Sequence, residues 1–552
     1  MQAVLTCNDQ PKFQHLECVG KVRHTYPLGT EEFSQEISPY MEDYPHKDTF
    51  IQMATSRPVK VNYTGYWKSV QKMDYPKEFK PDLFHDHALS LSKEYLKQFY
   101  ARPLLGKISA EWDKSAGYPW KTLNCKTKQD AIKHRNFANV FNAKPTPIWV
   151  LAGKGDEKLD LADLRDNKMR TFQIAPLEFV IKQKQLFTTA QMAMVNNKNH
   201  WIKYGMCLQY GGIQGFFRGL SKYSLRWESD VSGWDRKLQI MDDVYDLKYS
   251  LMEPFLSEGQ KDDFWHVADG VINSVFLTHD GRLYRRSCGN PSGSGSTTED
   301  NCVAHVIIMM RFLSKLYYDY TGSLPTLGEI LSNSDIGLFG DDNTGGINDE
   351  FFGVSDEVGF KSALIANYSF YSLIVKLSAC KVEKGIGDCR VSFLGMRCLG
   401  APGYNFQPNI GKVLSSLVYS TKKESFAIVC VRAIAIYRLL TYTAIQFMVR
   451  EYLLYLRQCD EVKQLKASDP CVYEQLFDID GPYSIYTGRE CYFDFFSGWQ
   501  KHCGGYLTLK YGIASTDNYT YEDGKKSPQQ DRLTPRKWDP DRVGPTVADP
   551  SY

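Results

Sequence analysis

Apolar residues change their spacing along the chain, and the change separates a mixed region from a helical one. Between residues 230 and 345, short apolar runs alternate with Gly-rich and Asp-rich breaks, which predicts strands mixed with helices. From residue 411 to about 466, longer apolar stretches carry charges at turn-like intervals, which predicts helices. The sequence therefore predicts a mixed α/β (α+β) centre followed by a helical region.

The most apolar stretch, residues 426–449, is a candidate for either a membrane span or a buried helix. Arg432 and Arg438 lie near its middle, where cations are costly in lipid. Arginine can instead bury its stem and extend its charged end to water. We therefore expect a buried helix here and no transmembrane segment.

Composition indicates a globular chain. Its 552 residues are 43% hydrophobic and 24% charged, which excludes a fibrous or wholly disordered protein. Because the formal net charge is only +2, any nucleic-acid surface must be local. Residues 114–222 offer one such surface, with 18 Lys+Arg against 7 Asp+Glu and aromatic residues between them; a solvated face is the alternative.

Residues 513–552, rich in Pro and charge, are expected to form a flexible tail.

Two short acidic motifs have the residues that divalent cations need. Asp230 and Asp235 lie five positions apart across a Gly, and Gly340-Asp341-Asp342 follows an apolar strand as a hairpin tip. Adjacent carboxylates repel each other unless a cation neutralises them. Taken alone, however, each motif is better explained as structural, the first as a turn residue with a helix cap and the second as a plain β-turn.

A Gly/Ser loop and a basic segment are typical of contacts with phosphates and sugars. The loop, residues 289–301, opens an apolar helix, and Thr297 and Asn301 share one face of that helix because they are four residues apart. Several cations must converge to bind a polyphosphate, and two short basic clusters around residues 154–158 and 168–170 can supply them. A capped helix after a linker and a solvated basic surface are the alternatives.

Read in chain order, these motifs resemble those of the RNA-dependent RNA polymerases of positive-strand RNA viruses, especially the picornavirus-, calicivirus- and sobemovirus-like groups. The resemblance covers residues 114–397, and seven motifs in the family's order leave little room for chance. The matching residues are Ser115, Gly117 and Pro119 (motif G), Lys154, Lys158, Lys168 and Arg170 (F), Asp230 and Asp235 (A), Ser292, Gly293, Thr297 and Asn301 (B), Gly340, Asp341 and Asp342 (C), Lys381 (D), and Phe393 and Leu394 (E).

The resemblance implies template-directed RNA synthesis from nucleoside triphosphates, replicating and transcribing a viral RNA genome. It implies two Mg²⁺ ions, with Mn²⁺ as the alternative, held by Asp230 and Asp341, with Asp342 in support and the carbonyl of Val231 completing a shell. Such ions would lower the pKa of a primer 3′-hydroxyl that attacks the α-phosphate and would stabilise the leaving oxygens.

Other roles also follow from the resemblance. Charge on the outer phosphates would be met by the basic residues of motif F, and Lys381 would protonate pyrophosphate, with Lys376 and Lys384 as competitors for that role. The ribose 2′-hydroxyl would be recognised by a hydrogen-bonded set braced by Thr297, namely Asp235, Ser292 and Asn301. Motifs G and E would contact template and primer.

The implied fold is a right hand with fingers, an antiparallel palm sheet backed by helices, and a helical thumb. The expected boundaries are 1–228 for the fingers with the N-terminal segment, 229–236 and 288–398 for the palm, 237–287 for a fingers insertion, 399–512 for the thumb and 513–552 for the tail.

The implied partners are an RNA template, a primer or nascent RNA, nucleoside triphosphates, and, within an infected cell, a viral protein primer and other replication proteins. The chain has 14 scattered cysteines with no C-x-x-C pair, so no zinc site is expected. The first residues lack the pattern of a secretory leader, which favours reduced thiols. We therefore expect it in the host cytoplasm, in replication complexes attached to membranes through other proteins.

Two rival functions share parts of this pattern. A reverse transcriptase has the same metal aspartates but usually excludes the 2′-hydroxyl with a bulky side chain, where this chain offers Asp235 and Asn301. A non-catalytic RNA-binding protein would use the basic segment and keep the aspartates only as turn residues.

Overall fold

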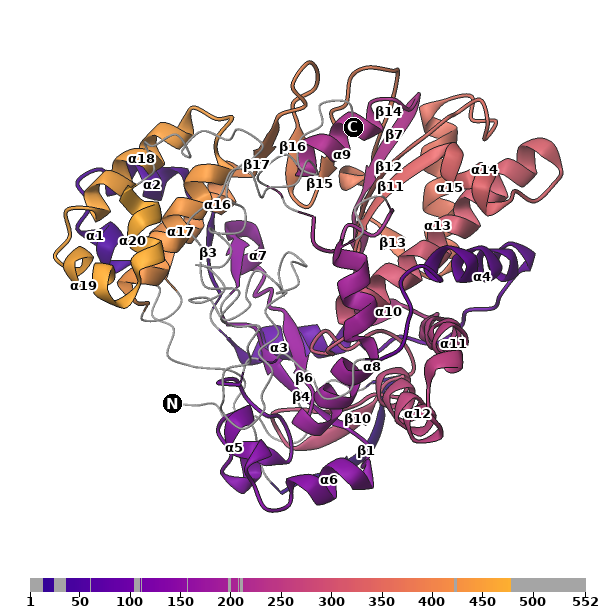
Figure 1. Ribbon diagram of the computed structural model, residues 1–552, viewed down its shortest axis with the longest axis horizontal. Coiled ribbons are helices and arrows are strands. Elements are labelled where there is room, and N and C mark those ends of the chain that lie inside the picture. Colours follow the sequence, from indigo (N-terminus) through magenta and orange to yellow (C-terminus); the bar gives the residue numbers. More distant parts are fainter. Residues whose placement is uncertain are drawn as a thin grey trace.

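The computed structural model describes residues 13–23, 36–59, 61–103, 110, 112–155, 157–196, 200–206, 208, 212–420 and 424–477. The expected tail, residues 513–552, therefore lies outside the described residues, as does the end of the expected thumb. Two sheets and a group of C-terminal helices lie around the middle of the molecule (Figure 1).

The central sheet consists of four antiparallel strands in the order β11-β12-β7-β14. These are β7 (Leu225–Ser229), β11 (Ser334–Phe339), β12 (Asp342–Ile347) and β14 (Lys381–Lys384). Two helices pack against it, α13 (Thr297–Thr321) beside β11 and α15 (Glu357–Phe370) beside β14. Residues 299–314 of α13 are all buried, and the charged residues among them are paired, Glu299 and Asp300 with Lys248 and Arg311 with Asp82.

A second, mixed sheet joins three distant segments of the chain. Its order is β1-β10-β9-β4-β6, with β4 and β9 parallel and the other pairs antiparallel. The strands are β1 (Glu17–Lys21), β4 (Ile148–Gly153), β6 (Thr171–Ile174), β9 (Val275–Leu277) and β10 (Arg282–Arg285). The N-terminal strand and the strands of the 237–287 segment therefore share one sheet with the basic region, which is consistent with the expected fingers.

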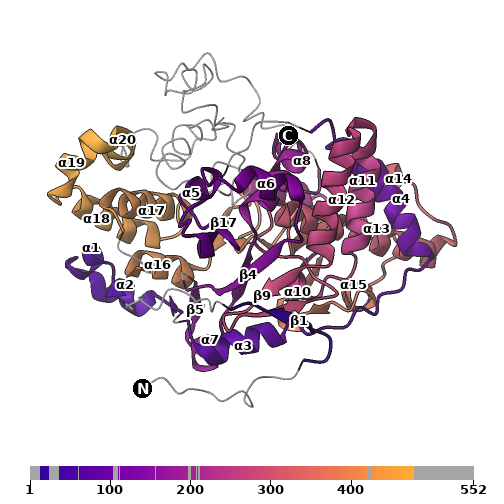
Figure 2. The ribbon, with the colours of Figure 1, turned by 90° about the horizontal axis from the view of Figure 1, so that it is seen from below.

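The C-terminal helices form a core of their own with two helices from the N-terminal region. This group contains α16 (Ile410–Val418), α17 (Phe426–Leu439), α18 (Ile445–Leu456), α19 (Glu461–Ser468) and α20 (Pro470–Phe477). The side chains of α1 (Pro39–Glu42) and α2 (Lys47–Met53) join its apolar cluster, and β2 (Glu36–Ile37) pairs with β18 (Tyr419–Ser420). Figure 2 shows α1 and α2 beside α16 and α18.

The apolar stretch 426–449 forms two helices rather than the one expected from its hydropathy. Two threonine hydroxyls end the first helix by donating to main-chain carbonyls, Thr441 to Arg438 at 2.6 Å and Thr443 to Leu440 at 2.8 Å. Arg432 is half-buried and donates to Glu424 at 2.7 Å, so its charge is paired within the protein. Among the described residues, we find no helix with the length and apolarity that a membrane crossing requires.

The remaining elements connect these three groups. They are α3 (Tyr63–Gln71), α4 (Leu83–Leu96), α5 (Lys128–Ile132), α6 (Phe137–Ala143), α7 (Leu161–Arg165), α8 (Leu177–Asn196), α9 (Gly212–Leu220), α10 (Trp234–Lys237), α11 (Met241–Met252), α12 (Glu258–Ile272), α14 (Leu327–Ser332), β3 (Ser56–Pro58), β5 (Lys158–Asp160), β8 (Val231–Ser232), β13 (Ile374–Val375), β15 (Ser392–Phe393), β16 (Met396–Cys398) and β17 (Phe406–Pro408).

Candidate active site

The register of the central sheet brings together aspartates that are more than one hundred residues apart in sequence. In the antiparallel ladder of β12 and β7, Asn343 lies opposite Ser229. Asp342 and Asp230 are the residues next to this pair in the two segments, and the charge of Asp230 acts on the Asp342 carboxyl. The Asn343 amide donates to the Ser229 hydroxyl at 2.7 Å, which fixes the ladder at this point. The predicted convergence of the two acidic motifs therefore follows from strand pairing.

Side chains of α13 hold the turn that carries Asp341 and Asp342. Gly340 has a φ of +65°, which glycine adopts readily. Its N–H donates to the Cys302 sulfur at 3.2 Å, and its carbonyl accepts from Nδ1 of His305 at 2.9 Å. Both side chains are fully buried. The main-chain donor and acceptor of this glycine are thus both tied to one rigid helix.

His305 is held in a single tautomer by its surroundings. Burial lowers the pKa of His305 to about 4, so the ring is neutral at pH 7. Because Nδ1 donates to the Gly340 carbonyl, Nε2 must accept, and the Tyr368 hydroxyl donates to it at 2.6 Å. The ring also stacks on Trp234 of α10, with centroids 4.5 Å apart. Sequence reasoning missed both His305 and Cys302, although their three-residue spacing on the helix that carries Asn301 was a usable signal.

The aspartates of the turn share a strongly negative environment. Burial, followed by the charges of Asp235, Asp342 and Asp230, raises the pKa of Asp341 from its ordinary 3.8 to about 7. Burial and the charge of Asp230 raise the pKa of Asp342 to about 6. Asp341 and Asp342 are nevertheless exposed to solvent, so screening by water reduces the energy behind these pKa shifts. A cation at this position would relieve the repulsion.

Lys376 supplies part of the positive charge that would balance these aspartates. Nζ of Lys376 lies 2.6 Å from Oδ2 of Asp230, and the Lys376 N–H donates to the Asp230 carbonyl at 2.9 Å. The other two candidate lysines pair elsewhere, Lys381 with Glu228 and Lys384 with Asp349, both at 2.7 Å. Of the three lysines compared by sequence, all of which the structure describes, only Lys376 has an ion pair with an expected metal ligand.

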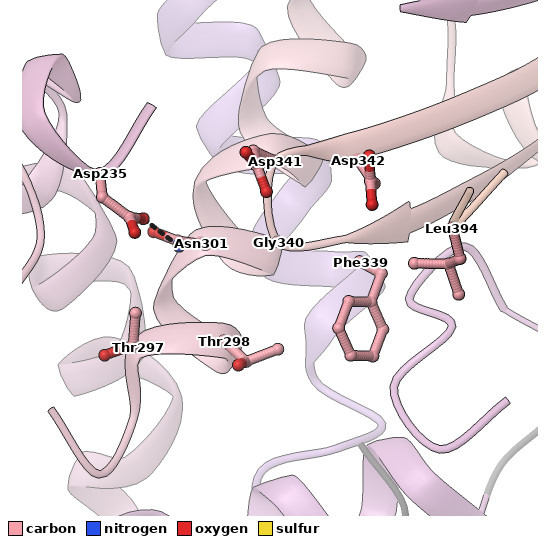
Figure 3. Close-up of a pocket in the computed structure, with 9 residues that line it drawn as sticks. All are labelled: Asp235, Thr297, Thr298, Asn301, Phe339, Gly340, Asp341, Asp342 and Leu394. Carbon is pink, nitrogen blue, oxygen red and sulfur yellow. Dashed lines mark hydrogen bonds between the residues drawn. The ribbon is translucent and has the colours of Figure 1, made fainter. Parts of the chain in front are cut away.

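A pocket of about 360 Å³ lies beside the Gly-Asp-Asp turn (Figure 3). At one end Asp235 and Asn301 point toward each other, and Nδ2 of Asn301 donates to Oδ1 of Asp235 at 2.7 Å. Burial raises the pKa of Asp235, while this hydrogen bond lowers it. The lining residues come from motifs A, B, C and E and are Asp235, Thr297, Thr298, Asn301, Phe339, Gly340, Asp341, Asp342 and Leu394.

The rest of the Gly/Ser loop is arranged differently from the expected hydrogen-bonded set. Thr297 braces the loop, because its hydroxyl donates to the Pro291 carbonyl at 2.7 Å. Ser292 is exposed, and its N–H donates to Oε1 of Gln173 at 3.1 Å; among the described residues, no hydrogen bond joins its hydroxyl to Asp235 or Asn301. Gly293 packs so tightly that a Cβ there would lie 1.5 Å from the Gln173 carbonyl oxygen.

The four basic residues of motif F do not all converge on the pocket. Arg170 lies close enough to Asp235 for its charge to lower the pKa of that carboxyl, and its carbonyl accepts from the Lys154 N–H at 2.9 Å. Lys168 pairs with Asp163 at 2.8 Å. Lys158 lies in β5, opposite Pro58 of β3.

The expected template and primer residues lie in two structured turns. Gly117 has a φ of +76°, and a Cβ there would lie 2.5 Å from the Ala175 carbonyl oxygen, so this loop, which includes Ser115 and Pro119, packs against the end of β6. Phe393 is buried in β15, and Leu394, with a φ of +52°, forms the turn to β16 and reaches the pocket. A positive φ is uncommon for leucine and is often found at functional sites.

Comparisons with known proteins agree with this geometry. A family profile described as viral RNA-dependent RNA polymerase matches residues 65–459. The chain belongs to this family. The polymerase also resembles the Sicinivirus 3Dpol RNA-dependent RNA polymerase, with a TM-score of 0.62 and 15% identity over 80% of this chain and 94% of that one. This likeness confirms the right-hand polymerase fold, while the expected subdomain boundaries stay predictions.

Curated relatives of the polymerase are much longer viral proteins. It is 28% identical to the non-structural polyprotein 1AB of Turkey astrovirus 1 over 319 residues, which are 55% of this chain and 19% of the polyprotein. It is 31% identical to the genome polyprotein of Tobacco vein mottling virus over 225 residues, which are 38% of this chain and 7% of that polyprotein. The chain thus spans less than a fifth of the length of both relatives.

The donors at the Gly-Asp-Asp turn fit a hard divalent cation in their chemistry. They are carboxylate oxygens, which Mg²⁺ and Mn²⁺ prefer, and burial together with neighbouring carboxylates raises their pKa values. Within the described residues, no three His, Cys, Asp or Glu side chains converge as a ready-made metal cage. Val231, the expected carbonyl ligand, directly follows Asp230 and lies in β8, opposite Val375.

Proposed function

We propose that the protein synthesises RNA on an RNA template from nucleoside triphosphates, and so replicates and transcribes a viral RNA genome. The observation that carries this proposal is the meeting of Asp230, Asp341 and Asp342 at one end of the central sheet, beside a pocket with the Asp235–Asn301 hydrogen bond. A primer terminus and a nucleotide would meet in this pocket, and template pairing would select the base.

In the proposed reaction, Asp230 and Asp341 would hold two Mg²⁺ or Mn²⁺ ions, with Asp342 and the Val231 carbonyl in support. When bound, such ions lower the pKa of an attacking hydroxyl and stabilise charge on phosphate oxygens. Because Asp341 and Asp342 follow a turn fixed by α13, their carboxylates project from a rigid support. Asp230 would exchange its partner Lys376 for a metal ion.

The basic residues would act on the triphosphate. Arg170 would meet its negative charge, because this cation lies close enough to Asp235 to lower the pKa of that carboxyl, and its ion pair with Glu157 would open first. Lys154, which is joined to Arg170 through the main chain, would assist it. Family resemblance assigns the proton for pyrophosphate to Lys381. Its ion pair with Glu228 must open before it can act in this way. Lys376 is the lysine already beside an aspartate of the site.

Ribonucleotides are the proposed substrates rather than deoxynucleotides. Asn301 and Asp235 line the pocket and offer a donor and an acceptor that a ribose 2′-hydroxyl can use. A site built to pair a hydroxyl strongly disfavours a substrate that lacks it. This pair therefore favours an RNA polymerase over a reverse transcriptase, and incorporation of ribonucleotides and deoxynucleotides on the same RNA template distinguishes the two.

Primer extension on a homopolymeric RNA template, with Mg²⁺ or Mn²⁺, tests the proposal. The informative variant is Asp341→Asn, which keeps the shape of the side chain but removes its charge. The matched control is Asp319→Asn, because Asp319 is exposed and pairs with Lys315 on α13. We expect synthesis by the parent and the control, and retained RNA binding without synthesis by Asp341→Asn. RNA binding with no synthesis by the parent in either metal would favour the non-catalytic RNA-binding alternative.

The wider context is proposed on the same basis. RNA template, primer and nucleoside triphosphates are the proposed partners, together with a viral protein primer and other replication proteins, since the relatives are viral polyproteins. The proposed location is the host cytoplasm, in replication complexes that reach membranes through those other proteins. Cell fractionation with and without the remaining viral proteins tests this location.

A further inference from the structure

Recognition of a ribose at this site depends on which end of the Asn301 amide faces Asp235. The two ends have nearly the same shape, but one is a donor and the other an acceptor. Nδ2 of Asn301 donates to Asp235 at 2.7 Å. On the other side of the amide, Oδ1 of Asn301 accepts from Nδ2 of Asn290 at 2.9 Å. The Asn301 amide is therefore oriented by both neighbours.

The orientation of Asn290 is itself fixed. Its Nδ2 also lies 3.3 Å from the Thr297 carbonyl oxygen, so a reversed amide would place Oδ1 against two acceptors. Its main-chain N–H donates to the Asp235 carbonyl at 2.8 Å. The preceding Gly289 has a φ of +92°, and a Cβ there would lie 2.7 Å from the same carbonyl oxygen. The backbone thus holds Asn290 beside Asp235. The Asn290 side chain contacts the Asp235 carboxylate indirectly, through the Asn301 amide.

The side chain of Asn290 contributes a hydrogen-bond donor, while its acceptor is left unpaired. The residue is fully buried, and its Oδ1 has no hydrogen-bond partner among the described residues. Leaving a buried acceptor unpaired costs about 1–3 kcal/mol, a cost that an apolar side chain would avoid. Asn290 is also absent from the described residues that line the pocket, so it has no direct route to a substrate. Its side chain contacts the site through two hydrogen bonds, to Oδ1 of Asn301 and to the main-chain carbonyl of Thr297, and the first of these acts on a side chain that lines the pocket.

We propose that Asn290 is a positioning residue for sugar selection, which orients the Asn301 amide and through it the Asp235 carboxylate toward a ribose 2′-hydroxyl. This inference rests on the proposed RNA synthesis. With Asn290 in place, the Asn301 NH₂ group faces Asp235 and its second hydrogen remains available to the sugar. Without it, the Asn301 amide loses the partner that holds its oxygen away from the pocket.

Two variants test this role. Asn290→Asp keeps the shape of the side chain but presents an acceptor to the Asn301 oxygen, and Asn290→Leu removes the donor without adding charge. The matched control is Asn273→Asp, which alters an exposed amide at the end of α12. The readout is kcat/KM for a ribonucleotide divided by that for its 2′-deoxy analogue, on one primer and template.

We expect both Asn290 variants to lower this ratio by about tenfold while deoxynucleotide incorporation stays close to that of the parent. For Asn290→Asp, the ratio should recover as the pH falls, because a protonated carboxyl regains a donor. An unchanged ratio, or an equal loss with both sugars, would overturn the inference while leaving the polymerase function intact. Absence of synthesis by the parent protein would instead remove the proposed function and this inference with it.

Discussion

The raised pKa of Asp341 predicts that this aspartate destabilises the metal-free fold at neutral pH. In the folded, metal-free protein, burial and neighbouring carboxylates raise its pKa to about 7, from 3.8. Between pH 3.8 and about pH 7, the Asp341 carboxyl keeps its proton in the folded state but has lost it in the unfolded state. The free energy of unfolding therefore falls as the pH rises through this interval, and the penalty is complete above pH 7.

The size of this effect can be bounded from the structure. A pKa difference of about three would correspond to about 4 kcal/mol for a group shielded from water. Because Asp341 is exposed to solvent, screening reduces the expected effect to about 1 kcal/mol. Asp341→Asn removes the ionisation, so with a chelator present we expect it to melt about 1–2 °C above the parent at pH 8. At pH 4 the difference should vanish, since the parent carboxyl is then protonated.

Thermal unfolding of the two proteins between pH 4 and 8, followed by circular dichroism, measures this difference. Asp319→Asn serves as the control, because that exposed carboxylate is paired with Lys315. Millimolar Mg²⁺ should then raise the Tm of the parent more than that of Asp341→Asn, since a ligand that binds only the folded state stabilises it. A variant less stable than the parent at pH 8, or a difference independent of pH, would refute the electrostatic reasoning.

Three further predictions concern other residues of the site. Lys376→Met should tighten Mn²⁺ binding by about two- to fivefold in a paramagnetic resonance titration, because an exposed ion pair is worth about 0.2–1 kcal/mol, whereas Lys381→Met should leave it unchanged. His305→Gln should lower kcat by about tenfold with little change in nucleotide KM, since the Gly-Asp-Asp turn loses a buried support; an altered KM alone would contradict this. Gly293→Ala should abolish most synthesis, because its Cβ would meet a carbonyl of β6 at 1.5 Å, while Gly295→Ala, with 3.4 Å to its nearest neighbour, should be tolerated.

Local sequence patterns predicted which residues form the site better than they predicted which of those residues contact one another. Asp341 and Asp342 were recognisable because a hairpin tip after an apolar strand is a local feature, and β11 and β12 form that hairpin. Their approach to Asp230 was inferred from family resemblance, whereas its physical cause is the pairing of Asn343 with Ser229. Ladder register depends on long-range packing, which no short window of sequence contains.

The features that sequence reasoning missed are also those set by long-range contacts. The ion pair of Lys376 with Asp230 depends on the pairing of β13 with β8, and the lysine favoured from sequence, Lys381, instead faces Glu228. The packing of α1 and α2 against the C-terminal helices joins segments nearly four hundred residues apart. The division of residues 426–449 into two helices depends on threonine hydroxyls that hydropathy does not register.

Helix α13 links the sugar pocket to the aspartate turn. Asn301 contacts Asp235, while Cys302, the next residue, and His305, one turn further along the same helix, bind the two main-chain groups of Gly340. The spacing between the pocket and the turn is therefore set by one rigid helix. The support of Asp230 is weaker, because its side chain is 44% exposed and the side chain of its partner Lys376 is 49% exposed. Since an exposed ion pair contributes little free energy, Asp230 is the carboxylate that can exchange its partner most easily when a divalent cation arrives.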